Sequence, residues 1–140
     1  MKAKLRALMA ILALCCVALS ASAQRPSPES QAARRLQACQ RAGDSAGVIA
    51  AWQTLAPTMR AGTHAPLVPF VALAYDTQGD ASQAHAMLEG LGNVLRGRSN
   101  YLTRSPASRA ATFAALERVA PLLTSDVARA DCAALLALPH

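Results

Sequence analysis

Apolar side chains recur every three or four positions through most of residues 28–138, which is the period of an amphipathic helix. In the first such stretch, Ala32, Leu36 and Cys39 fall on one stripe of the helix surface. No stretch shows the alternation of β-branched and polar residues that is typical of a half-exposed strand. The pattern therefore predicts an all-α fold of about six helices without a sheet.

Two stretches that lie 36 residues apart share one layout, in which a helical run is followed by Gly-Asp and then by a second helical run. The turns are Gly43–Asp44 and Gly79–Asp80. Glycine suits the left-handed residue that ends a helix, and aspartate suits the N-cap of the next helix. Counted from each glycine, equal offsets carry Val48 and Ala84, Trp52 and Leu88, and Leu55 and Leu91. The repetition predicts two similar helical hairpins, at about 29–56 and 65–92.

A third hairpin is expected at about 105–138, where Ser105–Pro106 gives a good helix start. It lacks the Gly-Asp turn, so it is either a divergent third unit or a cap. The stretch from Gly92 to Arg104 is predicted to be irregular. In the last helix, the expected inward residues are Val127, Ala130, Ala134, Leu135 and Leu138.

The first 23 residues have the layout of a secretory signal peptide. Lys2, Lys4 and Arg6 form a positive start, Leu8 to Leu19 is an uncharged apolar run, and the small residues 21–23 suit cleavage before Gln24. The alternative is an uncleaved anchor, because residues 7–23 carry no charge, although 17 residues is the lower limit for a span. We expect a periplasmic or secreted protein that meets a membrane only through an uncleaved signal.

The remaining chain, residues 24–140, is long enough for a single α-helical domain. Three of the 14 basic residues lie in the signal segment, so the formal charge of the remaining chain is +3 rather than +6. An exported protein with this small excess of arginine is not expected to bind nucleic acid.

Cys39 and Cys132 are the two cysteines that remain after the signal segment. In an oxidising compartment a disulfide between them would close a loop of nearly the whole domain. In an extended stack, however, the first and last helices lie too far apart for a bridge. The sequence leaves open a disulfide and two buried thiols.

The two Gly-Asp units resemble tetratricopeptide repeats, whose usual period is about 34 residues. Val71–Ala72 stands at the family's large-small pair, Tyr75 at its aromatic position, and Ala84 at the small residue of the second helix. The first unit matches at Trp52 and Leu55. It departs from the pattern at Arg35–Leu36 and Val48, and the resemblance covers about residues 29–91. An unrelated helical bundle with Gly-Asp turns is the alternative.

The resemblance implies a ligand groove on the concave face formed by the first helix of each hairpin. The matching positions are Ala33, Gln37, Gln40, Arg41, Pro69, Leu73, Asp76 and Thr77. A surface of amide, arginine and apolar side chains suits an extended peptide or another envelope protein. The same positions are also compatible with an ordinary solvated helix face.

The sequence shows no catalytic or metal-binding motif, and we expect no cofactor and no metal. His64, His85 and His140 lack metal-ligand spacing, and Asp80 is better explained as an N-cap than as an acid–base partner of Asp76.

The arginines at 96, 98 and 104 are candidates for contact with anionic lipid, polysaccharide or an acidic partner, and the alternative is a solvated loop. The sequence as a whole favours a non-catalytic interaction module of the bacterial cell envelope. The alternatives are a small secreted helical enzyme and a purely structural, disulfide-closed bundle.

The signal segment gives the first prediction. The exported protein should begin at Gln24, because the small residues 21–23 precede that position. Intact-mass analysis of the exported protein measures this directly. A mass that includes residues 1–23 would contradict it and would support the anchor.

Overall fold

A computed structural model describes residues 25–55, 64–97 and 105–139. This part of the chain is all-α and contains six α-helices, two short 3₁₀-helices and no strand, which confirms the predicted fold class. The helices are α2 (Pro28–Ala42), α3 (Ser45–Leu55), η2 (Ala65–Leu67), α4 (Val68–Thr77), α5 (Ala81–Arg96), α7 (Pro106–Val119), η3 (Ala120–Leu122) and α8 (Asp126–Leu136). None of the described helices has the length and apolar character needed to cross a bilayer.

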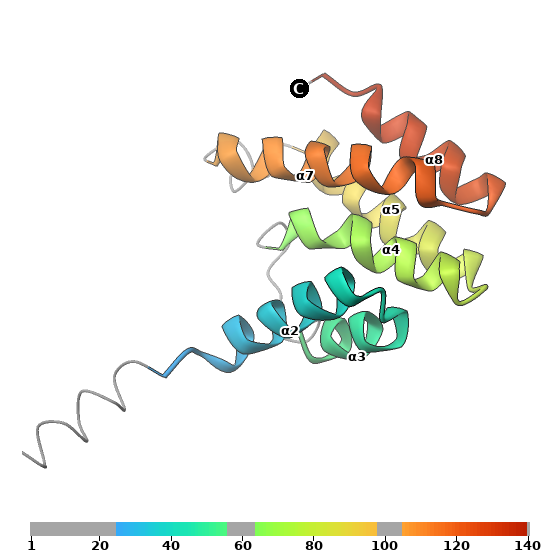
Figure 1. Ribbon diagram of the computed structural model, residues 1–140. Coiled ribbons are helices and arrows are strands. Elements are labelled where there is room, and N and C mark those ends of the chain that lie inside the picture. The colour runs from blue at the N-terminus through green and yellow to red at the C-terminus, as the bar shows by residue number, and fades with distance from the viewer. Residues whose placement is uncertain (1–24, 56–63, 98–104, 140) are drawn as a thin grey trace, which may run out of the picture.

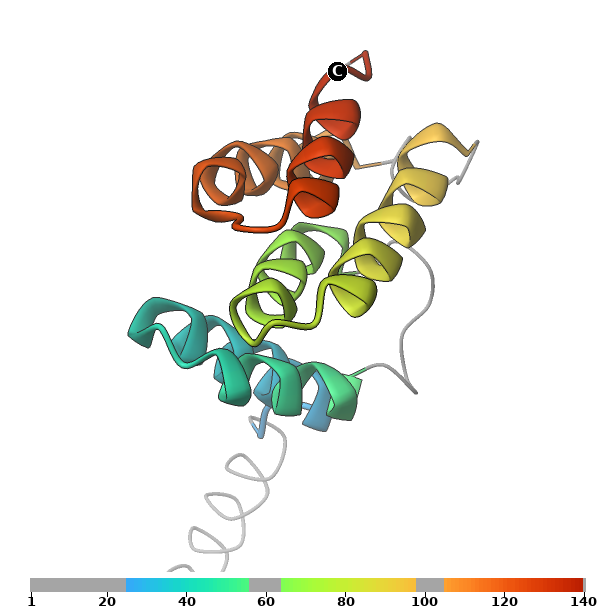
Figure 2. The same ribbon diagram turned by 90° about the vertical axis from the view of Figure 1, so that its right-hand side faces the viewer.

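The helices form three hairpins that lie one on another (Figures 1 and 2). The pair α2–α3 lies at one end of the stack, α4–α5 in the middle and α7–α8 at the other end. Helix α4 packs on α3, α7 packs on α4, and α8 packs on α5. The first helices of the three hairpins therefore follow one another along one side of the molecule (Figure 1).

The two Gly-Asp turns have the same geometry. Gly43 and Gly79 have φ angles of +73° and +80°, in the left-handed region that favours glycine. The Asp44 and Asp80 backbone amides donate to carbonyls five residues earlier, at 2.9 Å in both turns. Asp44 Oδ1 accepts the N–H of Gly47 at 2.9 Å, and Asp80 Oδ1 accepts that of Gln83 at 3.1 Å. Each aspartate thus caps the second helix of its hairpin, as the sequence predicts.

A carboxylate from another helix stabilises the third hairpin, which lacks Gly-Asp. Asp76 of α4 is only 4% exposed. Its Oδ2 accepts the backbone N–H of Thr124 at 2.6 Å and the hydroxyl of Thr124 at 2.9 Å, and its Oδ1 accepts the N–H of Ser125 at 3.1 Å. Ser125 in turn caps α8, since its Oγ accepts the N–H of Ala128 at 3.2 Å. Asp76 therefore holds the α7–α8 turn against the middle hairpin.

The core runs through all three hairpins, and its most fully buried large side chains include Leu36, Leu55, Val71, Leu88, Leu116 and Val119. Trp52 is buried as well, but at 9% exposed it is less completely covered than these leucines and valines. Because each hairpin contributes to one continuous cluster, no hairpin has a separate core.

One expectation about helix extent is wrong, and one about the inward face of the last helix is wrong in part. The stretch from Gly92 is predicted from the sequence to be irregular, but helix α5 continues through Gly92 to Arg96. Gly92 is a point of close contact between helices and not a helix end. A Cβ at Gly92 would lie 3.1 Å from Leu135 Cδ2 of α8, so glycine allows the two helices to approach.

In α8, the buried face consists of Ala128, Cys132 and Leu135. Of the expected inward residues, Leu135 is buried and Leu138 packs against the core, whereas Val127 is 53% exposed and Ala130 and Ala134 are exposed too. The packing of α8 on α5 therefore places Ala128 and Cys132 in the core, in place of the expected Val127, Ala130 and Ala134.

Cys39 and Cys132 are free thiols in the structure, so the disulfide is not formed. Cys132 is buried in α8, and its thiol donates to the carbonyl oxygen of Leu116 at 3.6 Å. Burial raises the pKa of the Cys132 thiol, which keeps it protonated and unreactive. Cys39 lies in α2, at the other end of the stack, and is half-buried.

Replacing either of two helical glycines, Gly47 and Gly90, by alanine is expected to change stability in opposite directions. At Gly47, a Cβ would lie 2.7 Å from Cys39 Sγ and would collide with the capping carboxylate of Asp44. At Gly90, a Cβ would meet no atom within 4 Å. Gly90→Ala should therefore raise the free energy of unfolding by about 0.5–1 kcal/mol. Gly47→Ala should lower it by about 1 kcal/mol, because overpacking and loss of the cap exceed the gain in helix propensity.

Urea unfolding of both variants measures the difference. Equal stabilisation by the two alanines would show that α2 and α3 do not approach as closely at Gly47 as the structure has them.

The Asp76 carboxylate makes stability depend on pH. Burial alone raises the pKa of Asp76, but the hydrogen bonds from Thr124 and Ser125 outweigh burial and hold the pKa below its ordinary value of 3.8. The stabilisation is thus fully present above pH 3.8 and is lost as the pH falls through the lowered pKa. Asp76→Asn should lower the free energy of unfolding at pH 7 by about 1–3 kcal/mol, since it removes charge-assisted hydrogen bonds.

Asp126→Asn is the matched control, because the Asp126 side chain is 98% exposed. Urea unfolding between neutral and acid pH should show a smaller acid loss for Asp76→Asn than for the wild type. A difference of zero between the two variants at neutral pH would contradict the role given to Asp76.

Candidate binding groove

A groove with two adjoining cavities runs between the first helices of the hairpins. The first cavity, of about 380 Å³, is lined by Gln40, Gly43, Asp44, Ser45, Val48, Phe70, Leu73, Ala74, Thr77 and Leu122. The second, of about 440 Å³, is lined by Leu36, Gln37, Gln40, Arg41, Pro66, Leu67, Phe70, Ala111, Ala114, Ala115 and Arg118. Gln40 and Phe70 line both cavities, so the two form one continuous surface.

The groove brings together five of the residues proposed from the sequence. Gln37, Gln40 and Arg41 reach it from α2, and Leu73 and Thr77 reach it from α4. These side chains come together because residues three or four positions apart lie on one face of a helix, and these faces of α2 and α4 both line the groove.

The three other proposed positions line neither cavity. Ala33 is half-buried against the core. Asp76 is wrong as a groove residue, because its carboxylate is buried and binds the α7–α8 turn instead. Pro69 is likewise buried, in the first turn of α4.

Three large side chains that the sequence did not identify also line the groove: Phe70, Arg118 and Leu122. Phe70 lies three positions before Leu73 and seven before Thr77, so the helical period places it on the same stripe. That spacing is the signal that could have identified Phe70. Arg118 and Leu122 come from the third hairpin, where the resemblance gives no positions.

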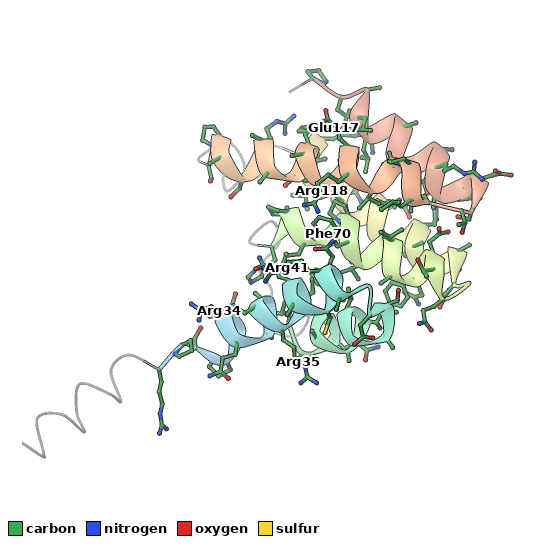
Figure 3. The ribbon with its side chains drawn as sticks, viewed as in Figure 1. Arg34, Arg35, Arg41, Phe70, Glu117 and Arg118 are labelled. Atoms are coloured by element: carbon green, nitrogen blue, oxygen red, sulfur yellow. The ribbon has the colours of Figure 1, made fainter. Side chains whose placement is uncertain are left out.

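Figure 3 shows Phe70 and Arg118 facing one another between α4 and α7. The guanidinium carbon of Arg118 lies 5.4 Å from the centroid of the Phe70 ring, within the range of a cation–π contact. Glu117, next in sequence, lies on the other side of α7, and Arg35 points away from the groove (Figure 3). The groove therefore combines an aromatic ring, amides and arginine.

The basic-loop candidates are only partly described. Arg96 is exposed in the last turn of α5 and lines neither cavity of the groove. Arg98 and Arg104 lie outside the described residues.

The two described histidines are engaged in pairs away from the groove. His64 Nε2 lies 2.7 Å from Glu29 Oε1, which links the segment before α4 to α2. His85 Nδ1 lies 2.7 Å from Asp131 Oδ2, which links α5 to α8. The hydrogen bond and charge of Asp131 raise the pKa of His85. His140 lies outside the described residues. In residues 25–55, 64–97 and 105–139, no three His, Cys, Asp or Glu side chains gather as metal ligands would.

A further cavity of about 390 Å³ lies along α7, next to Phe113 and Glu117, and shares Ala114 with the second cavity of the groove. All of its lining residues belong to α7, so a single helix forms it. The groove draws on three hairpins and offers more varied chemistry, which makes it the stronger candidate for binding.

Comparison with known proteins adds no further information on the groove, because no protein-family model, no curated protein and no solved structure matches this chain.

Proposed function

We propose that this chain is a non-catalytic interaction module of the bacterial cell envelope, which binds an extended segment of another protein. The observation that carries the proposal is the groove itself, to which α2, α4 and α7 each contribute side chains. Its location in the envelope rests on the signal layout of residues 1–23.

The chemistry of the lining suits a peptide better than a reaction. The amides of Gln37 and Gln40 can both donate and accept, as an extended backbone requires. Phe70 and Leu73 are half-buried and offer apolar contact area beside them. The lining contains no histidine or cysteine, and the carboxylate of Asp44 is already used as a helix cap.

We also propose that the first two hairpins are tetratricopeptide-like repeats. Their Gly-Asp turns share the same backbone geometry and the same capping hydrogen bonds. In this proposal, the third hairpin is a divergent unit in which Asp76 of the preceding hairpin takes the place of a Gly-Asp turn.

Selection from a random peptide library displayed on phage tests the proposed function. The exported protein should capture peptides that depend on the groove, so Phe70→Ala and Leu73→Ala should each reduce recovery about tenfold, as loss of a central contact does. Gln53→Ala is the control, because Gln53 is exposed on α3 and lines neither cavity.

Circular dichroism and thermal unfolding confirm in each case that the variant is folded. Recovery that is unchanged by Phe70→Ala and Leu73→Ala, or that falls equally with Gln53→Ala, would show that the groove is not the binding surface.

A further inference from the structure

Positive charge gathers in the cavity between α2 and α7. Arg41 and Arg118 both line it, and no acidic side chain does. Neither arginine forms an ion pair with any residue in the described part of the chain. This end of the groove therefore carries two positive charges that no described side chain neutralises.

Both guanidinium groups are held in place without a ligand. The guanidinium carbon of Arg118 lies 5.4 Å from the centroid of the Phe70 ring, and this cation–π contact restrains the group. Arg41 Nε donates to the carbonyl oxygen of Gln37 at 3.3 Å, and its Nη groups make no hydrogen bond to a described residue. Restrained guanidinium groups lose little freedom when a carboxylate binds, and they can bind it through two parallel hydrogen bonds.

The first cavity, which adjoins this cationic end, favours an apolar side chain over an anion. Phe70, Leu73 and Val48 line it, and so does Leu122, which is 59% exposed. Leu122 is one of two large hydrophobic side chains that are exposed in the described residues. Asp44 is the charged lining residue here, so an anion would be repelled while an apolar side chain would gain contact area.

We propose that the groove recognises an acidic–apolar segment of a partner protein. A glutamate or aspartate carboxylate lies between Arg41 and Arg118, and a large apolar side chain beside it packs on Phe70 and Leu122. Because Gln40 and Phe70 line both cavities, a short extended segment can occupy the two at once. This inference rests on the proposed function and names the chemical class of its ligand.

The peptides selected from the phage library test the inference through their composition. We expect enrichment of an acidic residue close to leucine, isoleucine or phenylalanine. The most enriched sequence is then made as a fluorescein-labelled peptide, together with versions in which its acidic residues are changed to amides or to lysines. Fluorescence anisotropy should show that the amide version binds about tenfold more weakly than the acidic peptide.

Charge reversals in the protein give matched comparisons. Arg41→Glu and Arg118→Glu should each weaken binding of the acidic peptide by about tenfold or more, because each places like charges together. Arg35→Glu makes the same change on the outer side of α2 and should alter affinity by less than about twofold. The double variant Arg41→Glu/Arg118→Glu should prefer the lysine peptide. Arg118→Gln replaces Arg118→Glu if the charge reversal prevents folding.

A separate variant tests the contact of the ligand's apolar side chain with the first cavity. Leu122→Ser should weaken binding of the acidic peptide about tenfold without changing its preference over the amide version, because Leu122 contacts only the apolar side chain. Unchanged affinity in this variant would contradict the placement of the apolar side chain.

The remaining outcomes separate this inference from the proposed function. Equal affinity for the acidic and amide peptides, with binding still lost in Phe70→Ala, would overturn the inference and leave the groove as a peptide site. Equal weakening by Arg35→Glu and Arg118→Glu would also overturn it, since attraction would then reflect the net charge of the protein. Failure to select any groove-dependent peptide would overturn both.

Discussion

The buried carboxylate of Asp76 is the constraint on which the arrangement of the third hairpin depends. It accepts three hydrogen bonds from Thr124 and Ser125, across 48 and 49 positions of the chain. A buried carboxylate is costly unless its lone pairs are satisfied, so this contact fixes the α7–α8 turn on α4 in one position. With the turn fixed, Arg118 and Leu122 come to lie at the groove.

The groove follows from the way in which the hairpins share one core. Each hairpin buries its face against the next, which leaves the outer turns of α2, α4 and α7 as one surface. Phe70 lies at the centre of this surface and touches both of its chemical environments, the cationic one and the apolar one. The core and the proposed binding groove thus depend on the same stack of hairpins but use different sides of the helices.

Much of the local structure could be predicted from the sequence, because it is set by short-range chemistry. The Gly43–Asp44 and Gly79–Asp80 turns and the Ser105–Pro106 helix start all follow from capping preferences. The contacts between hairpins could not be predicted, because they depend on packing over long separations. From its place in the helix, Asp76 is expected to face outward, yet it binds the distant α7–α8 turn. Gly92 is expected to end a helix, but it lies at a close contact with Leu135.

The most direct test of this account is the nuclear Overhauser effect between the Phe70 ring protons and the guanidinium Nε–H proton of Arg118, in the wild type and in Asp76→Ala. The account predicts a clear cross-peak in the wild type, since the guanidinium carbon lies 5.4 Å from the ring centroid. It also predicts that the cross-peak weakens or disappears in Asp76→Ala while the helices remain. A wild-type protein without the cross-peak, or a variant that keeps it at full strength, would contradict the claim that Asp76 places α7 at the groove.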